Sequence, residues 1–459
     1  MEDEVSRMNG VTSIGNAILF ILPSIFTVLL TSIYGVADAL VVSSHFGANA
    51  LASVIVILPI QYLLTAISMM FASGSASHIS HLIGRRDYKR ASSHMATVIL
   101  FVTAVAILIT VMFATIIGTI THFIGINGAV LSGAMEYGMA FSFAIPFFML
   151  QYVVSQILIV MGRGKSATMI LSTGLLLNIV YDLYMVSFTD LGLSGTGYST
   201  IVGTMFSTLG CLYLIYFDKK AILKRELPST DLKILIPICK NGLPQTINTL
   251  TLAVSTTLLL MFSVKLTGSE TVAARSVSIN LQVLLNSLYI GYNQGSISLA
   301  SYFYGKGDRE RISMMFRTGI IYTVTLSIIV FVSLQSVDSI IADLFMESEY
   351  SKERVKAYLD STSFTFIMTG LNMMVASMFV AASDSKHANL ISLTRTLYLG
   401  IPVLCIMSLT LGAYGLGIAS IITESLTLCL TVFLVYRYGY KYGFLRKDPF
   451  SIPRHNDGA

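Results

Sequence analysis

Long apolar stretches follow one another along almost the whole chain, separated by short polar connections. Each holds about 18 to 25 residues with few charges, which is the length that a helix needs to cross a hydrocarbon core about 30 Å thick. We therefore predict an all-α membrane protein with twelve transmembrane helices. The predicted spans are 14–42, 51–82, 92–120, 129–160, 165–187, 193–217, 233–262, 270–303, 311–335, 355–382, 386–409 and 412–437.

Composition supports this class and gives an orientation. Hydrophobic residues make up 54% of the chain and charged residues 12%, about half the charged share of a soluble domain. Most Lys and Arg residues fall in alternate connections, such as GRRDYKR at 84–90 and GKGDRER at 305–311. The positive-inside rule then predicts a multi-pass protein of the plasma (inner) membrane with both termini in the cytoplasm. These connections account for the net charge of +5, so it does not indicate nucleic-acid binding.

The two halves of the chain repeat one another. Residues 23–92 align with residues 244–313 without an insertion, at a fixed offset of 221. This alignment predicts two six-helix bundles, related as parallel repeats by an axis along the membrane normal, around a central cavity. We expect an N-terminal lobe at 1–222, which carries a cation-coupling site, and a C-terminal lobe with a cytoplasmic tail at 223–459. The paired residues include Pro23 and Pro244, Gly74 and Gly295, Gly84 and Gly305, Asp87 and Asp308, and Arg90 and Arg311.

The shared GRRD and GKGD segments favour a structural role. Gly84 and Gly305 suit a left-handed helix stop, and Asp87 and Asp308 can cap the next helix. We assign these residues no catalytic role.

Two acids within the spans are not duplicated. Asp38 aligns with Leu259, and Asp182 aligns with Pro402 at an offset of 220. Both acids lie about six residues, or about 9 Å, inside the outer ends of their helices. A carboxylate at a span centre costs about 2.5 to 3.5 kcal/mol, and such residues usually mark an ion path.

Two neutral residues share this depth. Asn178 lies one turn before Asp182 on the same helix face, and Thr200 lies at a similar depth in the next span. We predict that both meet Asp38 and Asp182 in the outer half of the N-terminal bundle. Two carboxylates in a low dielectric resist being charged together, so the pair is suited to carry a proton. The four oxygen-bearing groups would equally suit Na⁺, or each acid could simply be solvated at a helix end.

Other polar groups in the spans are weaker candidates. Gln151, Gln156 and Asn293 either line the cavity or join helices by hydrogen bonds. Pro23 permits a bend that could couple protonation to the shape of the cavity, or it makes a fixed kink. The residues Glu136, Glu424 and Arg395 receive no assigned role.

Together these features resemble the multidrug and toxic compound extrusion (MATE) transporters. The resemblance rests on the two six-span halves, Pro23 followed by Asp38, the FGANALAS loop at 46–53, the GRRD loop, and Asn178 and Asp182 followed by GLSGTGYST. It covers about residues 14 to 437. Within the family the chain is similar to the DNA-damage-inducible F branch, because its seventh span lacks an acid.

The resemblance implies a function for these positions. Asp38, Asn178, Asp182 and Thr200 would form the coupling site, with Tyr34 one turn before Asp38 and also facing the substrate cavity. Pro23 would be the bending proline of the first helix. The family exports amphipathic, often cationic compounds in exchange for H⁺ or Na⁺, so we expect an antiporter rather than an enzyme, with no cofactor, acting as a monomer in the bilayer.

Three alternatives remain at this point. A lipid-linked sugar flippase of the same superfamily would need more spans and a basic cavity, and the chain has few buried Arg residues. An intramembrane enzyme is disfavoured because the seven His residues do not pair with a nucleophile or with a second His at metal-ligand spacing. A channel is not excluded by the repeat.

Overall fold

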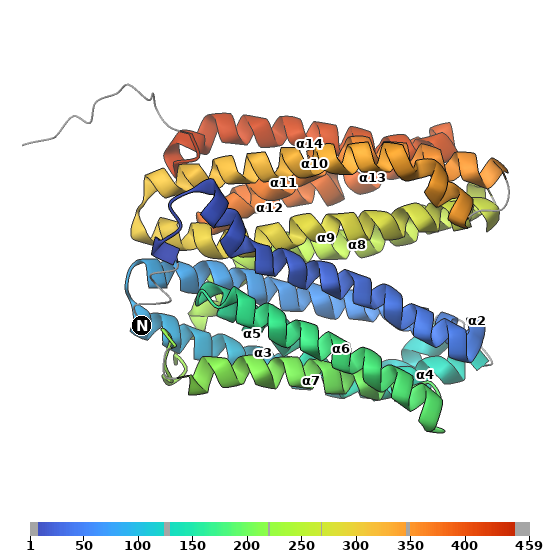
Figure 1. The fold of residues 1–459 in the computed structure, drawn as a ribbon, viewed down its shortest axis with the longest axis horizontal. Helices are drawn as coiled ribbons and strands as arrows, with labels where there is room; N and C mark the ends of the chain where they lie inside the picture. The colour runs from blue at the N-terminus through green and yellow to red at the C-terminus, as the bar shows by residue number, and fades with distance from the viewer. Residues whose placement is uncertain (1–7, 124–128, 219–220, 268, 346–348, 446–459) are drawn as a thin grey trace, which may run out of the picture.

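The chain folds into long helices that lie side by side (Figure 1). The computed structural model describes residues 8–445 except 124–128, 219–220, 268 and 346–348, and it leaves out many side chains between 34 and 52 and between 251 and 280. The first half contains α2 (Ile14–Gly84), α3 (Tyr88–Phe123), α4 (Ala129–Ser142), α5 (Ile145–Val160), α6 (Gly164–Phe188) and α7 (Ser194–Phe217). The second half contains η1 (Leu232–Ile234), α8 (Leu235–Thr267), α9 (Ser269–Lys306), α10 (Arg309–Phe345), α11 (Glu349–Ala381), α12 (Ser385–Leu393), η2 (Thr394–Tyr398), α13 (Gly400–Leu411) and α14 (Ala413–Tyr442).

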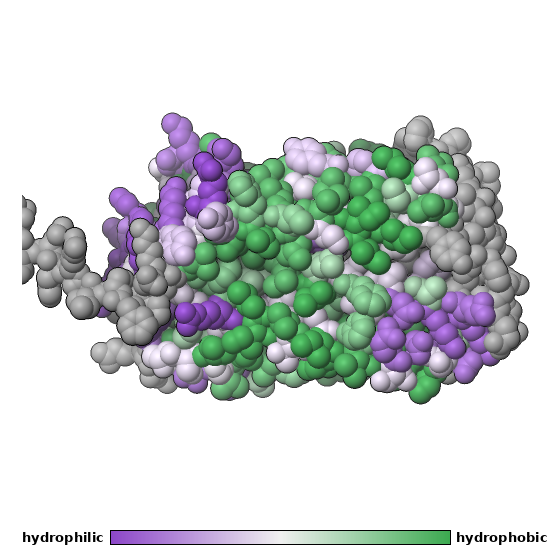
Figure 2. All heavy atoms as spheres, turned by 90° about the horizontal axis from the view of Figure 1, so that it is seen from above, coloured by the Kyte–Doolittle hydropathy of each residue, from purple (hydrophilic) through white to green (hydrophobic). Residues whose placement is uncertain are grey.

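The surface is that of a membrane protein. Figure 2 shows a hydrophobic belt along the middle of the molecule, with hydrophilic side chains at the left end and in a patch towards the right. Large side chains such as Leu108, Phe188 and Leu409 are 60%, 77% and 73% exposed. These apolar side chains lie on the outer surface and do not pack in a core, but the lipid chains of a bilayer can solvate them.

Ten of the twelve predicted spans are matched in the part of the chain that the structure describes. Among the described residues, nine helices are long and apolar enough to cross a membrane, or ten when α4 and α5 count as one bent span. The predicted spans at 233–262 and 270–303 correspond to α8 and α9, which are not among these. The all-α membrane class is confirmed.

The first two spans lie within the single assigned helix α2. A straight helix of 71 residues would be about 106 Å long. Its two ends instead meet the same region: Asn9, just before α2, accepts hydrogen bonds from Tyr302 and Lys306, and Gly84 packs against Gly305. The chain therefore folds back within α2. A loop was predicted at 43–50, but the structure assigns helix to these residues.

Two other spans are broken at prolines. The predicted span 129–160 forms α4 and α5, which meet at an angle of 51° next to Pro146. The predicted span 386–409 is interrupted by the π-helical turn η2, which ends four residues before Pro402. Because proline has no N–H, the carbonyl one turn earlier loses its partner and the helix bends or widens there.

The two halves pack together at one end of the molecule, which we call the basic end because the segments GRRDYKR and GKGDRER lie there. A Cβ atom added to Gly84 would lie 2.3 Å from the Tyr302 carbonyl oxygen. A Cβ atom added to Gly305 would lie 2.1 Å from the His81 carbonyl oxygen. Since both pairs are related by the same offset of 221, the contact is reciprocal, as a two-fold relation between repeats requires.

This contact corrects the role that the sequence predicted for these two glycines. The residues with positive φ at the helix ends are Arg86 and Gly307, at 63° and 76°. Gly84 and Gly305 lie in the last turns of α2 and α9 without a positive φ, and the absence of a side chain there permits close approach of two backbones.

The capping prediction is confirmed. The Asp87 carboxylate accepts the Arg90 N–H at 3.3 Å, and the Asp308 carboxylate accepts the Arg311 N–H at 3.1 Å. Each carboxylate satisfies an N–H of the first turn that has no partner within the helix.

Candidate functional site

Asp38 and Asp182 meet between α2 and α6. Their side chains lie within electrostatic reach of each other, although they come from segments far apart in sequence. The buried Asp182 Oδ2 atom has no hydrogen-bond partner among the described residues. Asp182 is 1% exposed, and the Ser199 hydroxyl of α7 donates to its Oδ1 atom. We call Asp38, Asp182 and Ser199, with Asn178, the carboxyl cluster.

Glycines bring α6 and α7 close enough to form this cluster. A Cβ atom on Gly174 would lie 2.7 Å from the Gly203 carbonyl oxygen, and one on Gly203 would lie 2.7 Å from the Asn178 Cβ atom. Ser199 lies one turn before Gly203 and shares its helix face, so it faces α6 as well. The close approach therefore aims the Ser199 hydroxyl at Asp182.

The other predicted members of the site are placed differently. Asn178 is buried, and its Oδ1 atom has no hydrogen-bond partner. Thr200 donates its hydroxyl to the Thr196 carbonyl of its own helix at 3.1 Å. The side chain of Tyr34 lies outside the described residues. The sequence analysis therefore selected Thr200, whereas its neighbour Ser199 contacts Asp182. The only sequence feature that pointed to Ser199 was its hydroxyl group within the GYST segment.

A buried tyrosine adjoins the cluster and was also missed. Tyr137 of α4 is 3% exposed and lies within electrostatic reach of both acids. Its hydroxyl accepts a hydrogen bond from the Gln61 side chain at 3.0 Å. Four helices, α2, α4, α6 and α7, therefore surround the acids with polar side chains; Asp182 is buried and Asp38 is half-buried.

Pro23 fastens α2 to α6. Its carbonyl oxygen accepts the hydroxyl groups of Thr27 at 2.9 Å and Thr168 at 2.7 Å, and the two threonine oxygens lie 2.8 Å apart. Because a proline also leaves the carbonyl one turn earlier without a helical partner, this part of α2 depends on side-chain contacts with its neighbour.

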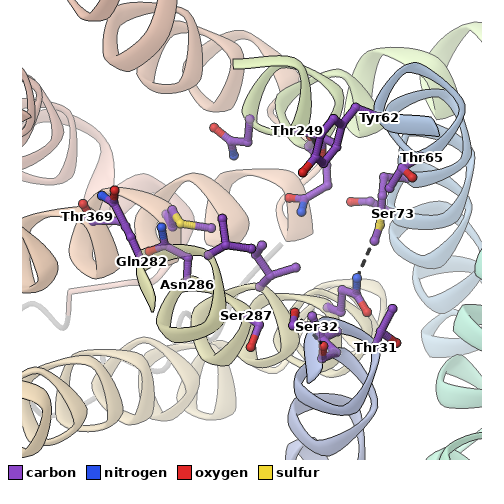
Figure 3. A pocket seen from close by; sticks show the side chains of 18 of the residues that line it. Thr31, Ser32, Tyr62, Thr65, Ser73, Thr249, Gln282, Asn286, Ser287 and Thr369 are labelled. Atoms are coloured by element: carbon purple, nitrogen blue, oxygen red, sulfur yellow. Dashed lines mark hydrogen bonds between the residues drawn. The ribbon is translucent and has the colours of Figure 1, made fainter. Parts of the chain in front are cut away.

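A cavity of about 400 Å³ lies between the two halves. Figure 3 shows its polar side chains converging from several helices, including Thr31, Tyr62, Thr249 and Asn286. Its walls come from α2, α5 and α6 of the first half and from α8, α9, α11, η2, α13 and α14 of the second. Its size and mixed polarity suit a small amphipathic molecule.

The predicted cavity residues divide. Gln151 and Gln156 line the cavity, whereas Asn293 is buried and is not among the lining residues. Gln156 also joins the halves, because its Nε2 atom donates to the Gln294 carbonyl at 2.9 Å and to the Ser298 hydroxyl at 3.1 Å. Both roles considered for Gln156 are therefore present.

The cavity and the carboxyl cluster lie along the same helices. Leu175 of α6 and Ser32 of α2 line the cavity. Asp182 follows Leu175 by seven residues and Asp38 follows Ser32 by six, which is about 9 to 11 Å along each helix. Since α2 runs away from the basic end, the cluster lies beyond the cavity in the direction of the opposite end.

An ion pair stands in the cavity wall. Arg395 of η2 and Glu424 of α14 both line the cavity, and the Arg395 Nε atom donates to Glu424 Oε1 at 2.5 Å. The buried Asn372 side chain donates to Glu424 Oε2 at 2.9 Å and accepts the Thr431 hydroxyl at 2.8 Å. We call these four residues the charged corner.

Replacing Asn372 by leucine should lower stability, because the change leaves a Glu424 oxygen and the Thr431 hydroxyl without a partner. Each buried unsatisfied group costs about 1 to 3 kcal/mol, so we expect a loss of about 2 to 4 kcal/mol and a lower thermal midpoint in detergent. The matched control is Gln335→Leu, which removes an exposed hydrogen bond to Asp360 and should have an effect of less than about 0.5 kcal/mol. Equal midpoints for the two variants would contradict this reading of the corner.

Two further features of the sequence receive a place. The exposed Glu136 accepts the Ser194 N–H at 3.2 Å and so caps the start of α7. His78 Nε2 and His94 Nδ1 lie 2.9 Å apart with stacked rings, a contact that their spacing of 16 residues did not indicate. Among the described residues, no three His, Cys, Asp or Glu side chains form a metal-binding group.

Comparison with known proteins gives a consistent result. The MatE family model matches residues 23–184 and again residues 244–406. The multidrug export protein MepA of Staphylococcus aureus (strain NCTC 8325 / PS 47) is 23% identical over 431 residues, covering 91% of this chain and 92% of MepA. A structure described as the outward-facing conformation of a multidrug resistance MATE family transporter has a TM-score of 0.87 at 21% identity and covers 94% of this chain and 97% of that chain.

A second solved structure has the same fold. It is a MOP superfamily transporter from Pyrococcus furiosus, described as having a binding pocket of reverse polarity, with a TM-score of 0.87, 20% identity and coverage of 95% of this chain and 97% of that chain. The double match of the family model falls on the two halves that the internal repeat defines. With most of its length matched in this way, the chain belongs to the MATE family of membrane transporters.

Proposed function

We propose that the protein is a proton-coupled antiporter that exports amphipathic compounds through the central cavity, with Asp38 and Asp182 as the coupling residues. The relative MepA is a multidrug export protein, and the size and polarity of the cavity agree with such substrates. This assignment places the chain in the branch of the family in which acids of the N-terminal lobe (1–222) carry the ion.

The closeness of the two acids carries the proposal. Two carboxylates this close together in a poorly hydrated place are unfavourable when both are charged, so the pair favours a state in which one of them holds a proton. Loss of that proton would leave two negative charges together in a place with little water, which is unfavourable. The cluster thus has two states. With the proton bound, α2 and α6 attract each other, and without it the two negative charges push them apart.

Export follows from this difference. In the state open away from the basic end, a proton binds the cluster and draws α2 towards α6, which narrows the cavity and weakens substrate binding. Return to the state open at the basic end releases the proton there. A bend at Pro23, between the cavity and the basic end, would let the outer part of α2 move, while the Thr27 and Thr168 hydroxyls hold the Pro23 carbonyl in place. Coupling requires only that proton and substrate favour different states.

The orientation of the protein completes the scheme. The basic connections face the cytoplasm by the positive-inside rule, so the packed end is the cytoplasmic end and the cavity is reached from outside in this state. Tyr34, one turn before Asp38, would connect the cluster with the substrate. We expect a monomer, since each chain carries both halves of the cavity.

Sodium is the second candidate ion. The buried Asn178 Oδ1 atom has no hydrogen-bond partner, and an oxygen of this kind one turn from Asp182 would suit a dehydrated cation. In that case the two carboxylates would bind Na⁺ in place of the proton.

Transport by the purified chain in proteoliposomes tests the proposal. A pH gradient alone should drive uptake of a fluorescent cation such as rhodamine 123 against its concentration gradient, and a Na⁺ gradient alone should not. Flux driven only by Na⁺ would replace the proton by Na⁺ at the same cluster. Flux that is independent of both gradients would reject an antiporter and favour a channel.

A further inference from the structure

The charged corner is the part of the cavity that the coupling scheme does not use. Among the described lining residues, Arg395 and Glu424 are the only ones with a formal charge, and the rest are apolar or neutral polar. They belong to the second half of the chain, whereas the acids of the carboxyl cluster belong to the first. The charged corner therefore contains a cation and an anion, whereas the charged groups of the carboxyl cluster are both acids.

Glu424 is held in one place. Its carboxylate oxygens are occupied separately, Oε1 by Arg395 and Oε2 by Asn372. Asn372 is fully buried and is itself fixed by Thr431. A carboxylate held on both sides has little capacity left for a ligand and acts instead as a support for the arginine.

The terminal nitrogens of the Arg395 guanidinium group are the atoms left for a ligand. The bond to Glu424 uses the Nε atom, and among the described residues neither terminal nitrogen has a hydrogen-bond partner within the protein. The side chain is 18% exposed and lines the cavity. A guanidinium group held at Nε offers its two terminal N–H groups as a planar fork, which matches a carboxylate.

The backbone conformation around Arg395 is unusual and agrees with a functional role for this residue. Arg395 lies in the π-helical turn η2, whose extra residue displaces the side chain from the regular helical spacing of α12 and α13. Such turns are rare and occur frequently at functional sites. Here the turn brings an arginine from the membrane interior to the cavity wall, where water and ligand offset part of the cost of its burial.

We propose that the charged corner is a subsite for the acidic group of a substrate, in which the terminal nitrogens of Arg395 bind a carboxylate and Glu424 positions the guanidinium group. The subsite selects zwitterionic amphipathic compounds over their esters. This inference rests on the proposed export function, and it assigns to the second half of the chain a task separate from ion coupling.

A matched pair of dyes tests the proposal. Rhodamine 110 carries a free carboxylate, and rhodamine 123 is its methyl ester. We expect the parent protein in detergent to bind both, as followed by fluorescence polarisation. Arg395→Gln should weaken binding of rhodamine 110 at least about tenfold, the usual effect of losing a hydrogen bond to a charged group, and should change binding of rhodamine 123 by less than about twofold.

Further variants separate recognition from loss of fold. Arg395→Lys keeps the charge but loses the fork, so it should retain only part of the preference for the acid dye. The double variant Arg395→Gln with Glu424→Gln leaves no unpaired charge, and it should show the same selective loss if the single variant fails to fold. Transport of both dyes in proteoliposomes provides the second measurement.

The outcomes are distinct. Selective loss of rhodamine 110 supports the subsite. Failure of the parent to bind rhodamine 110, or equal loss of both dyes in the folded variants, overturns it while export of rhodamine 123 continues. If the parent moves neither dye under any gradient, the proposed function itself fails and the subsite fails with it.

Discussion

Export driven by a pH gradient should fall at least about tenfold when Asp182 is replaced by asparagine, because coupling free energies of this kind amount to about 1 to 3 kcal/mol. Asparagine can accept the Ser199 hydroxyl and donate to Asp38, so the packing of α6 against α2 and α7 should persist. What is lost is the ability to gain and release a proton. Transport into proteoliposomes under an imposed pH gradient is the direct measurement.

The same substitution should leave the protein folded. Asparagine removes the buried one of two neighbouring carboxyl groups, and functional sites often hold such unfavourable pairs at a cost to stability. We expect the thermal midpoint in detergent to be equal to that of the parent or higher. Dye binding at a fixed pH should survive, because Asp182 does not line the cavity.

Binding measurements across pH extend this test. In the parent, dye affinity should fall as the pH is lowered, since protonation and substrate favour different states and linkage is reciprocal. In Asp182→Asn and Asp38→Asn this dependence should disappear. The matched control is Asp190→Asn, an exposed acid eight residues beyond Asp182, which should behave as the parent does. Full gradient-driven export by both cluster variants would show that the coupling assignment is wrong.

The second large effect is expected at the contact between the halves. Gly84→Ala and Gly305→Ala each place a methyl group about 2 Å from a backbone carbonyl oxygen, and backbone cannot move aside as a flexible side chain can. Overpacking of this kind costs about 1 to 3 kcal/mol, which corresponds to about a 5- to 150-fold change in a conformational equilibrium. We expect the halves to separate at the basic end, so that the state open there becomes more populated.

Cysteine labelling measures this opening. Ser301 is fully buried on α9 near the contact. In a background without the four native cysteines, Ser301→Cys should react slowly with a maleimide and should react faster once Gly84→Ala is added. Gly15→Ala is the control, because a Cβ atom at this helical glycine meets no atom within 4 Å. Labelling at the parent's rate and an unchanged thermal midpoint in both glycine variants would contradict the prediction.

Much of the fold was predictable because it depends on local and repetitive properties of the sequence. Apolar stretches of sufficient length indicate membrane helices wherever they occur, and a conserved spacing of Pro, Gly, Asp and Arg between the halves indicates a duplication. The N-terminal caps at Asp87 and Asp308 were predictable for the same reason, since a cap involves residues only three apart. The interruptions at Pro146 and at η2 lay within spans that hydropathy describes as continuous.

The site was predictable in its acids and less so in its neutral partners. A carboxylate in an apolar span is costly enough to be informative from sequence alone, so Asp38 and Asp182 stood out. The choice between Ser199 and Thr200 depends on a rotation of about 100° around the axis of α7. That rotation is fixed by the close approach of Gly174 and Gly203, which no property of the GYST segment reveals.

By itself, then, the sequence determined the class of the protein, its duplicated plan and the two acids that are costly to bury, because each of these depends on composition or on spacing along one chain. Tertiary structure alone decided that α2 folds back on itself, that Gly84 and Gly305 serve helix contact rather than helix termination, and that Arg395 and Glu424 share one cavity wall. These features depend on distances between segments that are separated in sequence, from 29 residues for Arg395 and Glu424 to more than two hundred for the two glycines, and such distances are set by how the helices pack.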